Sequence, residues 1–373
     1  MSNNNKKIRV LSVFGTRPEA AKMGPVVDEL RTRPSFDSLV CVTAQHREML
    51  DQVLEVFKIK PDYDLNIMQK TQSLEDIITA CLTGLCGVIR DAMPDIVLVH
   101  GDTSTTFAAS LAAFYSKTKL GHVEAGLRTG CKHQPFPEEI NRRLTSVMAD
   151  FHFAPTHAAK RNLLAEGLHE KSIFVTGNTA VDCLRYSLER SFENSVLANL
   201  NTGGKRIITM TAHRRENIGK NLDNILKAVL RIAREYPDVL VIYPIHPNPS
   251  VLQQAKSTLR GQQNILTMQP LSMTDMHNLI ARSYIVLTDS GGIQEEAPGL
   301  NVPVVVLRNV TERPEGIEAG AAMLAGTQSN DIYSATKNLL DNKNLHTNMA
   351  AAQNPYGNGF AAKHIASTLM GLL

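Results

Sequence analysis

The stretch YIVLTDSGGIQEEAPGL, residues 284 to 300, has the form of a buried strand that turns directly into a helix. Its apolar, β-branched run ends at Thr288, and Ser290, Gly291 and Gly292 then suit the first turn of a helix. Runs with this strand-then-helix form recur along the whole chain. The alternation predicts an α/β fold in which parallel sheets carry helices on both faces.

The alternation stops and then restarts, which divides the chain of 373 residues into two halves. A chain of this length exceeds one ordinary hydrophobic core, so we expect two α/β domains, residues 1–180 and 181–359, with a hinge near 178–200. The final helix, 360–373, is free to pack back on either domain, the first included. Strands are expected at 8–15, 39–44, 95–101, 120–126 and 172–177 in the first half and at 206–213, 239–246, 264–270, 284–291 and 302–308 in the second.

Composition limits the class of partner. The formal net charge of +3 arises from 39 basic and 36 acidic residues without a long Lys/Arg run, so no nucleic-acid partner is expected. The first apolar run ends at Gly15 and is too short for a signal peptide or a membrane span, so no membrane partner is expected either. Five cysteines without a C-x-x-C pair favour a reduced, cytoplasmic protein over a disulfide framework or a zinc knuckle.

Functional residues are expected directly after the strands. In open parallel sheets ligands bind beyond the carboxyl ends of the strands, and two such sheets facing each other would form one cleft. The first turn, GTRPEA, carries Arg17, which is equally well explained as a solvated side chain in an ordinary strand-to-helix turn. It contains no G-x-G-x-x-G pattern, so it does not indicate a dinucleotide cofactor.

Two later strand ends each place a histidine and a carboxylate two residues apart. These pairs are His100 with Asp102 and His122 with Glu124, and residues two apart on a strand share a face. Divalent-metal ligation is one interpretation. We favour half-buried structural roles for the histidines and acid–base work for the two carboxylates.

A third acidic cluster lies at the start of a predicted helix. The segment PFPEEINRRL places Glu138 and Glu139 after two prolines and Arg142 four residues beyond Glu138. Acidic residues also favour the first turn of a helix for purely electrostatic reasons. The stiff proline approach nevertheless favours a functional carboxylate here.

The second half combines a basic cluster with an anion cradle. His213 ends the strand at 206–213 and is followed by Arg214 and Arg215. These neighbours disfavour protonation of the histidine and can hold an anion. The Ser290, Gly291 and Gly292 amides can bind a diphosphate, and Glu296, one turn deeper, can accept hydrogen bonds from hydroxyls. Phosphate with sugar hydroxyls describes a nucleotide, to which Arg313 adds a further anion contact. Capping of the helix by Ser290 is the alternative, and both roles are compatible.

Long motifs across the chain resemble the bacterial non-hydrolysing UDP-N-acetylglucosamine 2-epimerases. The resemblance implies two facing Rossmann-like domains of the GT-B type and interconversion of UDP-GlcNAc and UDP-ManNAc. The implied route is anti elimination of UDP to 2-acetamidoglucal followed by re-addition, with no cofactor or metal. The motifs include FGTRPEA, VLVHGDT, GHVEAGLRTG, PEEINRRLT, VTGNT, TAHRREN, LTDSGGIQEEAP and TERPE.

The resemblance also implies roles for individual residues. Glu124 or Glu138 is the candidate for the base that removes the C2 proton, with Asp102 in support. The implied catalytic residues are Asp102, Glu124, Glu138 and His213, and the implied UDP-binding residues are Arg17, Lys22, Arg142, Ser290, Gly291, Gly292, Glu296 and Arg313.

Many relatives of this kind are activated by UDP-GlcNAc at a second site, and a homodimer is implied. The loops that correspond to the effector site contain Gln45, His46, Gln69, Arg214 and His246. Three other activities fit parts of the pattern: a 2-epimerase for another UDP-sugar such as a diacetamido-uronic acid, a hydrolysing epimerase, and a GT-B glycosyltransferase. A non-catalytic UDP-sugar-binding protein would not need this set of acids. The implied product would supply surface polysaccharide synthesis.

Overall fold

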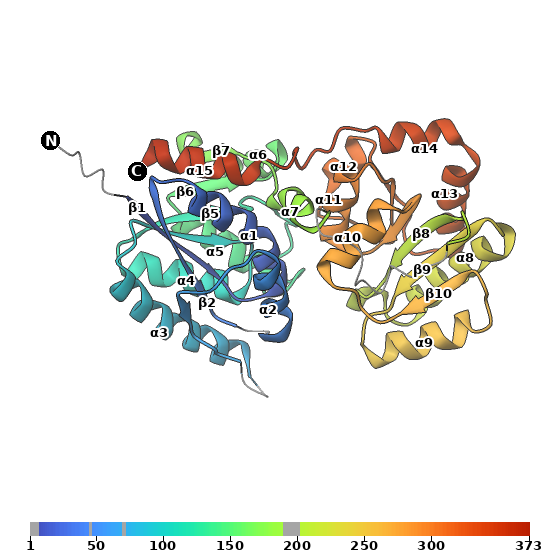
Figure 1. Cartoon of the computed structure of the whole chain (residues 1–373), viewed down its shortest axis with the longest axis horizontal. Coiled ribbons are helices and arrows are strands. Elements are labelled where there is room, and N and C mark those ends of the chain that lie inside the picture. The colour runs from blue at the N-terminus through green and yellow to red at the C-terminus, as the bar shows by residue number, and fades with distance from the viewer. Residues whose placement is uncertain (1–6, 45–46, 69–71, 189–201) are drawn as a thin grey trace. The chain divides into compact units, whose positions relative to one another are not determined.

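The computed structural model describes residues 7–44, 47–68, 72–188 and 202–373, and its contacts divide the chain into two compact α/β units (Figure 1). The first unit contains Met1–Tyr186 together with Tyr356–Leu373, and the second contains Ser187–Pro355. Each unit has its own parallel sheet. This arrangement confirms the predicted α/β class with two Rossmann-like domains.

The sheet of the first unit has seven parallel strands in the order β3-β2-β1-β4-β5-β6-β7. The strand order reverses between β1 and β4, which makes their carboxyl ends the switch point where ligands bind in such sheets. The strands are β1 (Ile8–Phe14), β2 (Phe36–Val42), β3 (Tyr63–Asp64), β4 (Ile96–His100), β5 (Lys119–Val123), β6 (Phe151–Ala154) and β7 (Ile173–Val175).

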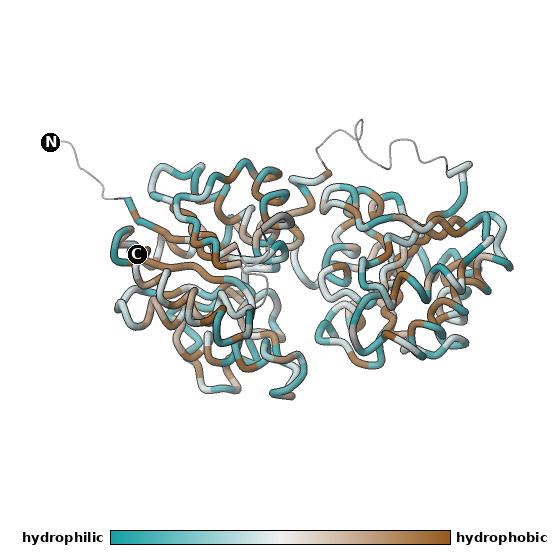
Figure 2. The backbone as a smooth tube through the Cα atoms, turned by 90° about the horizontal axis from the view of Figure 1, so that it is seen from below, coloured by the Kyte–Doolittle hydropathy of each residue, from teal (hydrophilic) through white to brown (hydrophobic). Residues whose placement is uncertain are grey.

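Helices enclose this sheet, so its strands are apolar on both faces. Every residue of β4 is buried, and Figure 2 shows hydrophobic stretches of the backbone tube inside both units. The helices are α1 (Arg17–Thr32), α2 (Arg47–Val56), α3 (Leu74–Ala92), α4 (Ser104–Tyr115), α5 (Glu138–Met148), α6 (His157–Ala165), η1 (Glu170–Ser172), α7 (Thr179–Leu188) and α15 (Ala361–Leu372).

The C-terminal helix α15 belongs to the first unit and contacts α1. The buried Asp182 side chain, from α7, accepts hydrogen bonds from the backbone N–H groups of Ala361 and Ala362 at 3.1 and 2.9 Å. Those amides lack partners within the helix, and a carboxylate favours the positive end of the helix dipole. Asp182 therefore fixes where α15 begins.

The sheet of the second unit has six parallel strands in the order β10-β9-β8-β11-β12-β13, with its switch point between β8 and β11. The strands are β8 (Arg206–Thr211), β9 (Val239–Pro244), β10 (Ile265–Met268), β11 (Ile285–Thr288), β12 (Val304–Val306) and β13 (Ala322–Leu324). The helices are η3 (Arg215–Asn217), α8 (Lys220–Glu235), α9 (Pro249–Leu259), α10 (Met273–Ala281), α11 (Gly291–Gly299), α12 (Pro314–Glu318), α13 (Ser329–Asp341) and α14 (Lys343–Ala350).

Three strands escape the sequence prediction: β3, β6 and β13. They have two to four residues each, so neither alternation nor a long apolar run marks them. They form because an established parallel neighbour supplies the hydrogen-bonding edge. Tertiary pairing, rather than local pattern, creates these strands.

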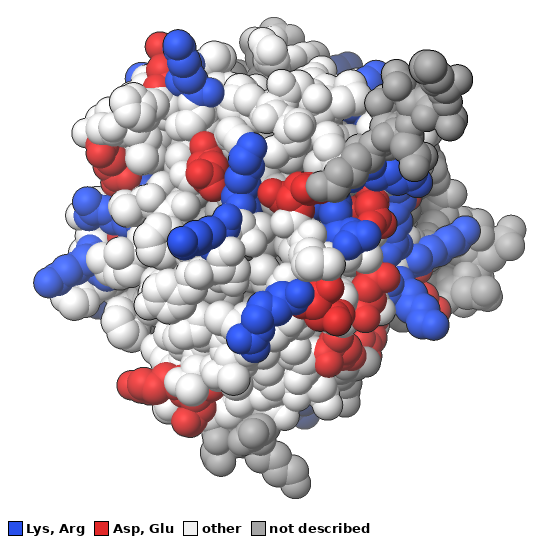
Figure 3. Space-filling view, turned by 90° about the vertical axis from the view of Figure 1, so that its left-hand side faces the viewer, with Lys and Arg blue, Asp and Glu red and all other residues white. Residues whose placement is uncertain are grey.

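The surface carries charges of both signs. On the face in Figure 3, Lys and Arg side chains are interspersed with Asp and Glu side chains. No helix within the described ranges is long and apolar enough to cross a bilayer. All five cysteines are free thiols.

Candidate functional site

The predicted site residues form two polar groups, one at the strand ends of each unit. In the first unit they lie on the segments that follow β1, β4 and β5. In the second unit they follow β8, β9, β11 and β12. Both groups therefore lie at the switch point of their own sheet.

Glu124 is the centre of the first group. It directly follows β5 and has a φ of +63°, a left-handed conformation that residues other than glycine seldom adopt. Its Oε2 atom forms an ion pair with Lys22 Nζ, accepts a hydrogen bond from Asn178 Nδ2 at 2.9 Å and lies 3.7 Å from His100 Nε2. The adjacent ammonium favours the ionised carboxylate, the form that a general base requires.

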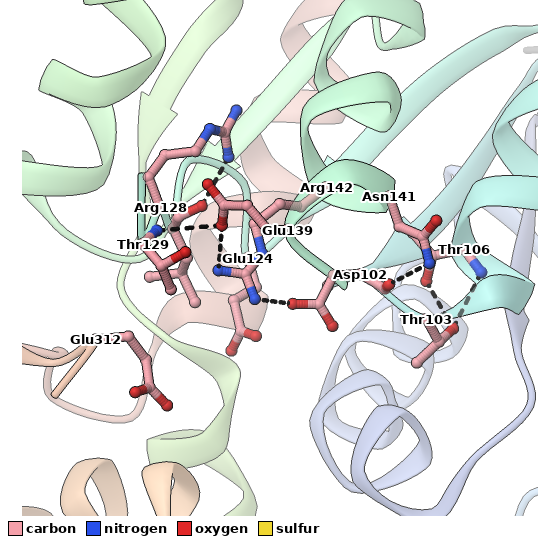
Figure 4. A network of polar contacts seen from close by, with 12 residues as sticks. Asp102, Thr103, Thr106, Glu124, Arg128, Thr129, Glu139, Asn141, Arg142 and Glu312 are labelled. Carbon is pink, nitrogen blue, oxygen red and sulfur yellow. Dashed lines mark hydrogen bonds and ion pairs between the residues drawn. The ribbon is translucent and has the colours of Figure 1, made fainter. Parts of the chain in front are cut away.

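Asp102 and Arg142 form a second pair in the same unit. Arg142 Nη2 contacts Asp102 Oδ2, and Arg142 Nη1 lies 3.3 Å from Glu139 Oε2 (Figure 4). Glu139 is buried and accepts the backbone N–H groups of Thr129 and Gly130 at 3.1 and 3.2 Å. Glu139 is thus a structural anchor that aims Arg142 at Asp102.

Glu138 differs sharply from Glu139, its neighbour at the start of α5. Its side chain is half-buried, and among the residues that the structure describes it has no hydrogen-bond or ion-pair partner. An uncommitted carboxylate is available to a substrate. The paired glutamates therefore have separate roles, one structural and one open to chemistry.

The two histidines predicted beside the carboxylates, His100 and His122, are buried and neutral. Burial lowers the pKa of His100 to about 4 although Glu124 opposes the shift, and burial lowers the pKa of His122 to about 3. His122 Nε2 is 2.8 Å from the carbonyl oxygen of Gly101, which joins β5 to the turn after β4. Within the described ranges no three His, Cys, Asp or Glu side chains lie close enough together to hold a metal ion.

Arg17 is the first residue of α1, and a buried carboxylate organises the turn beside it. Glu19 Oε2 accepts the N–H groups of Gly15 and Thr16 at 3.1 and 2.8 Å, and Glu19 Oε1 accepts Thr103 Oγ1 at 2.7 Å. Burial raises the pKa of Glu19, which four hydrogen bonds partly oppose. This carboxylate therefore locks the turn after β1 to the turn after β4.

In the second unit, Asp289 organises the basic loop that follows β8. Its Oδ2 atom accepts the N–H groups of His213 and Arg214 at 2.8 and 2.9 Å and Asn217 Nδ2 at 3.0 Å. Its Oδ1 atom lies 3.3 Å from His213 Nδ1. The His213 ring stacks on His246 with centroids 5.4 Å apart, so His213 is held from two sides.

The predicted anion cradle is the N-terminus of α11. Ser290 makes no side-chain cap, and its own N–H donates to Thr288 Oγ1 at 2.9 Å. Gly291 and Gly292 follow as the first two helical residues, whose amides have no acceptor within the helix. Of the three predicted amides, those of the glycines are thus the ones best placed for a phosphate.

Arg313 and Arg214 meet at a carboxylate that the sequence interpretation overlooked. Glu312 lies 3.1 Å from Arg214 Nη2, 3.3 Å from Arg313 Nη1 and 2.5 Å from Arg308 Nη1. Burial opposes its ionisation, but the three arginines prevail and lower the pKa of Glu312 to about 2. Arg313 Nε also donates to the buried Glu295 at 2.7 Å.

The remaining predicted residues have simple placements. Glu296 is half-buried, with Oε2 at 3.4 Å from His277 Nε2. Burial, with the neighbouring His213, lowers the pKa of His246. Gln45, His46 and Gln69 lie outside the described residues.

Sequence reasoning missed Asp289, Asn178 and Glu312, although a signal existed for the first two. Asp289 immediately follows β11, and Asn178 follows β7 by three residues, so the strand-end rule applied to both. Glu312 shares the loop after β12 with Arg308 and Arg313, and only the tertiary structure brings Arg214, from the loop after β8, against it.

Comparison with known proteins gives a consistent result. A family model described as UDP-N-acetylglucosamine 2-epimerase matches residues 28–370. The UDP-N-acetylglucosamine 2-epimerase of Bacillus subtilis is 53% identical over 365 residues, which cover 98% of this chain and 96% of that protein.

Solved structures agree in fold and in sequence. The crystal structure of UDP-GlcNAc 2-epimerase from Neisseria meningitidis bound to UDP-GlcNAc matches with a TM-score of 0.91 and 47% identity, covering 98% of this chain and 100% of that one. That of the Methanocaldococcus jannaschii enzyme in complex with UDP-GlcNAc and UDP matches with a TM-score of 0.83 and 33% identity, at the same coverages.

Proposed function

Because this chain belongs to the UDP-N-acetylglucosamine 2-epimerase family, we propose that it is an isomerase that interconverts UDP-GlcNAc and UDP-ManNAc. The observation that carries the proposal is the match over nearly the whole chain to enzymes of that name, including one bound to UDP-GlcNAc. The two polar groups at the strand ends supply the chemistry that such a reaction needs.

The first step of the proposed reaction is an elimination. A carboxylate removes the C2 proton, the C1–C2 double bond forms, and the C1–O bond breaks with its electron pair passing to the β-phosphate of UDP. The C2 proton has no adjacent carbonyl to acidify it, so stabilisation of the departing diphosphate must lower the barrier. The second step returns a proton to the opposite face of C2 and re-adds UDP to C1.

Residues of the second unit are assigned to the departing nucleotide. The glycine amides of α11 and the Arg313 guanidinium bind the diphosphate, Glu296 binds ribose hydroxyls, and His213, held by Asp289, stabilises the developing charge. Ser290 begins the helix. Arg17 of the first unit is assigned to the same diphosphate.

Residues of the first unit are assigned to the sugar. Inversion at C2 requires proton transfer on both faces of the ring, which suits two carboxylates in different settings, Glu124 and Glu138. Lys22 pairs with Glu124, and Arg142 orients Asp102 in support. Lys22 and Arg142 are also assigned to UDP, in addition to their ion pairs with these carboxylates.

The proposal also covers regulation, oligomeric state, pathway and location in the cell. Activation by UDP-GlcNAc at a second site would use Arg214 and His246, and the protein would act as a homodimer. Its product would supply ManNAc-type sugars for surface polysaccharide. A cytoplasmic location fits the five free thiols.

Proton NMR in deuterated water tests the function directly. Purified protein is incubated with UDP-GlcNAc, which also meets any effector requirement. UDP-ManNAc with deuterium at C2 supports the proposal, whereas free ManNAc with UDP indicates hydrolysis and an unchanged, undeuterated sugar rules out this substrate.

Amide variants then separate the carboxylates. Glu124→Gln and Glu138→Gln are each compared with Glu139→Gln, the buried structural neighbour. A variant that still exchanges the C2 proton at the wild-type rate has not lost the base.

A further inference from the structure

Three side chains from three helices form a chain of polar contacts that ends at Glu296, the carboxylate proposed to bind the ribose of UDP. Ser187 of α7 lies with its Oγ 2.6 Å from His277 Nδ1, and His277 Nε2 of α10 lies 3.4 Å from Glu296 Oε2 of α11. Ser187 and His277 are almost completely buried, whereas the Glu296 side chain is 20% exposed. The chain therefore runs from the interior towards a surface that a ligand can reach.

For a neutral His277, the order of donors in this chain follows from its two ends. An ionised carboxylate can only accept, so His277 Nε2 must carry the proton that faces Glu296. In a neutral imidazole Nδ1 is then an acceptor, and the Ser187 hydroxyl is the group that donates to it. The serine thus selects the histidine tautomer that holds Glu296.

Ser187 is itself immobilised. Asn278, the next residue of α10, donates from Nδ2 to the Ser187 carbonyl oxygen at 3.1 Å and to the Thr274 carbonyl oxygen at 2.8 Å. Consecutive residues of α10 therefore hold both the side chain and the backbone of Ser187. The hydroxyl has little freedom to turn away from His277.

We propose that Ser187 and His277 are positioning residues that hold Glu296 in the orientation that recognises the ribose of UDP. Neither touches the nucleotide. They act through the Glu296 carboxylate, whose Oε1 atom lies 3.5 Å from the position that a Cβ on Gly292 would occupy, at the start of α11. This inference rests on the proposed function, which assigns the UDP ribose to Glu296.

The test is the loss of affinity when one ribose hydroxyl is removed. Kd values for UDP, 2′-deoxy-UDP and 3′-deoxy-UDP are measured by titration calorimetry with the full-length protein. A hydrogen bond to a charged group predicts that the wild type binds at least one deoxy ligand about 10-fold to 100-fold more weakly than UDP.

Two substitutions of His277 separate the ends of its ring. His277→Gln can place an amide N–H near the Nε2 position and keep the donor to Glu296, so it is expected to retain most of the discrimination. His277→Asn places its amide nearer Nδ1 and loses the donor to Glu296. The ratio of the Kd for the deoxy ligand to the Kd for UDP is therefore expected to fall below about 3-fold, while the Kd for the deoxy ligand changes little.

Two serine substitutions complete the design and do not depend on folding of the histidine variants. Ser187→Ala is expected to reduce the ratio to an intermediate value. Ser283→Ala removes another hydrogen-bonded hydroxyl of the second unit, one bonded to Thr209 at 2.7 Å, and is expected to keep the wild-type ratio.

The outcomes distinguish a failure of this inference from a failure of the proposed function. Wild-type ratios in both His277→Asn and Ser187→Ala would mean that the chain serves packing only. A wild type that binds UDP but ignores both deoxy substitutions would overturn the inference and leave the epimerase proposal standing. Failure of the wild type to bind UDP would overturn both.

Discussion

The replacement Glu312→Gln tests how much the second unit is stabilised by the carboxylate that three of its arginines share. The side chain is 11% exposed and contacts Arg308, Arg214 and Arg313 at 2.5, 3.1 and 3.3 Å. Glutamine keeps the shape but removes the charge. It leaves three guanidinium groups close together without that counter-ion.

The magnitude follows from the pKa of Glu312. The arginines outweigh burial and lower this pKa from 4.5 to about 2. That difference corresponds to about 3 kcal/mol in favour of the folded state. Because the folded-state pKa is depressed, the contribution is complete above pH 4.5 and is lost as the pH falls towards 2. At pH 7 the substitution is therefore expected to lower the free energy of unfolding of the second unit by about 3 kcal/mol.

Urea unfolding followed by circular dichroism at pH 7 measures the loss, and hydrogen exchange assigns it to the second unit. Glu216→Gln is the matched control, because Glu216 also faces Arg308, at 3.5 Å, but is 55% exposed. An exposed pair contributes less than about 1 kcal/mol, so this control should remain close to wild type. Equal stability of Glu312→Gln and Glu216→Gln would refute the reasoning.

Three further perturbations have defined outcomes. In Gly291→Ala the new Cβ would lie 3.0 Å from Glu312 Oε1, so UDP binding measured by calorimetry should weaken by about 1–3 kcal/mol; an unchanged Kd would contradict the cradle. Asp289→Asn should destabilise the second unit by about 2 kcal/mol in urea unfolding, because the backbone N–H that donates to Asp289 would then face an NH2 group. It should also reduce kcat, because His213 would no longer be held in place. Because burial lowers the pKa of His100 to about 4, the stability of the first unit should fall as the pH drops from 6.5 towards 4, and His100→Gln should flatten that slope in a pH series of urea unfolding.

Sequence patterns predicted the architecture because the signals concerned are local. A β-branched run followed by a helical period marks a strand and its covering helix, and the ten strands predicted in this way suffice to specify two parallel sheets. The strand-end rule likewise located Asp102, Glu124, His213 and Gly291 without coordinates, since parallel strands bring their carboxyl ends to one edge. The short strands β3, β6 and β13 had no local signal and were missed.

The sequence by itself therefore determined the fold class, the family and the segments that carry polar chemistry. Only the tertiary structure decided how those side chains combine: Lys22 with Glu124, Arg142 with Asp102, and Ser187 with His277 and Glu296. Periodicity reports which way a side chain faces along its own element. It carries no information on which charge of another element lies opposite, because that depends on how distant segments pack.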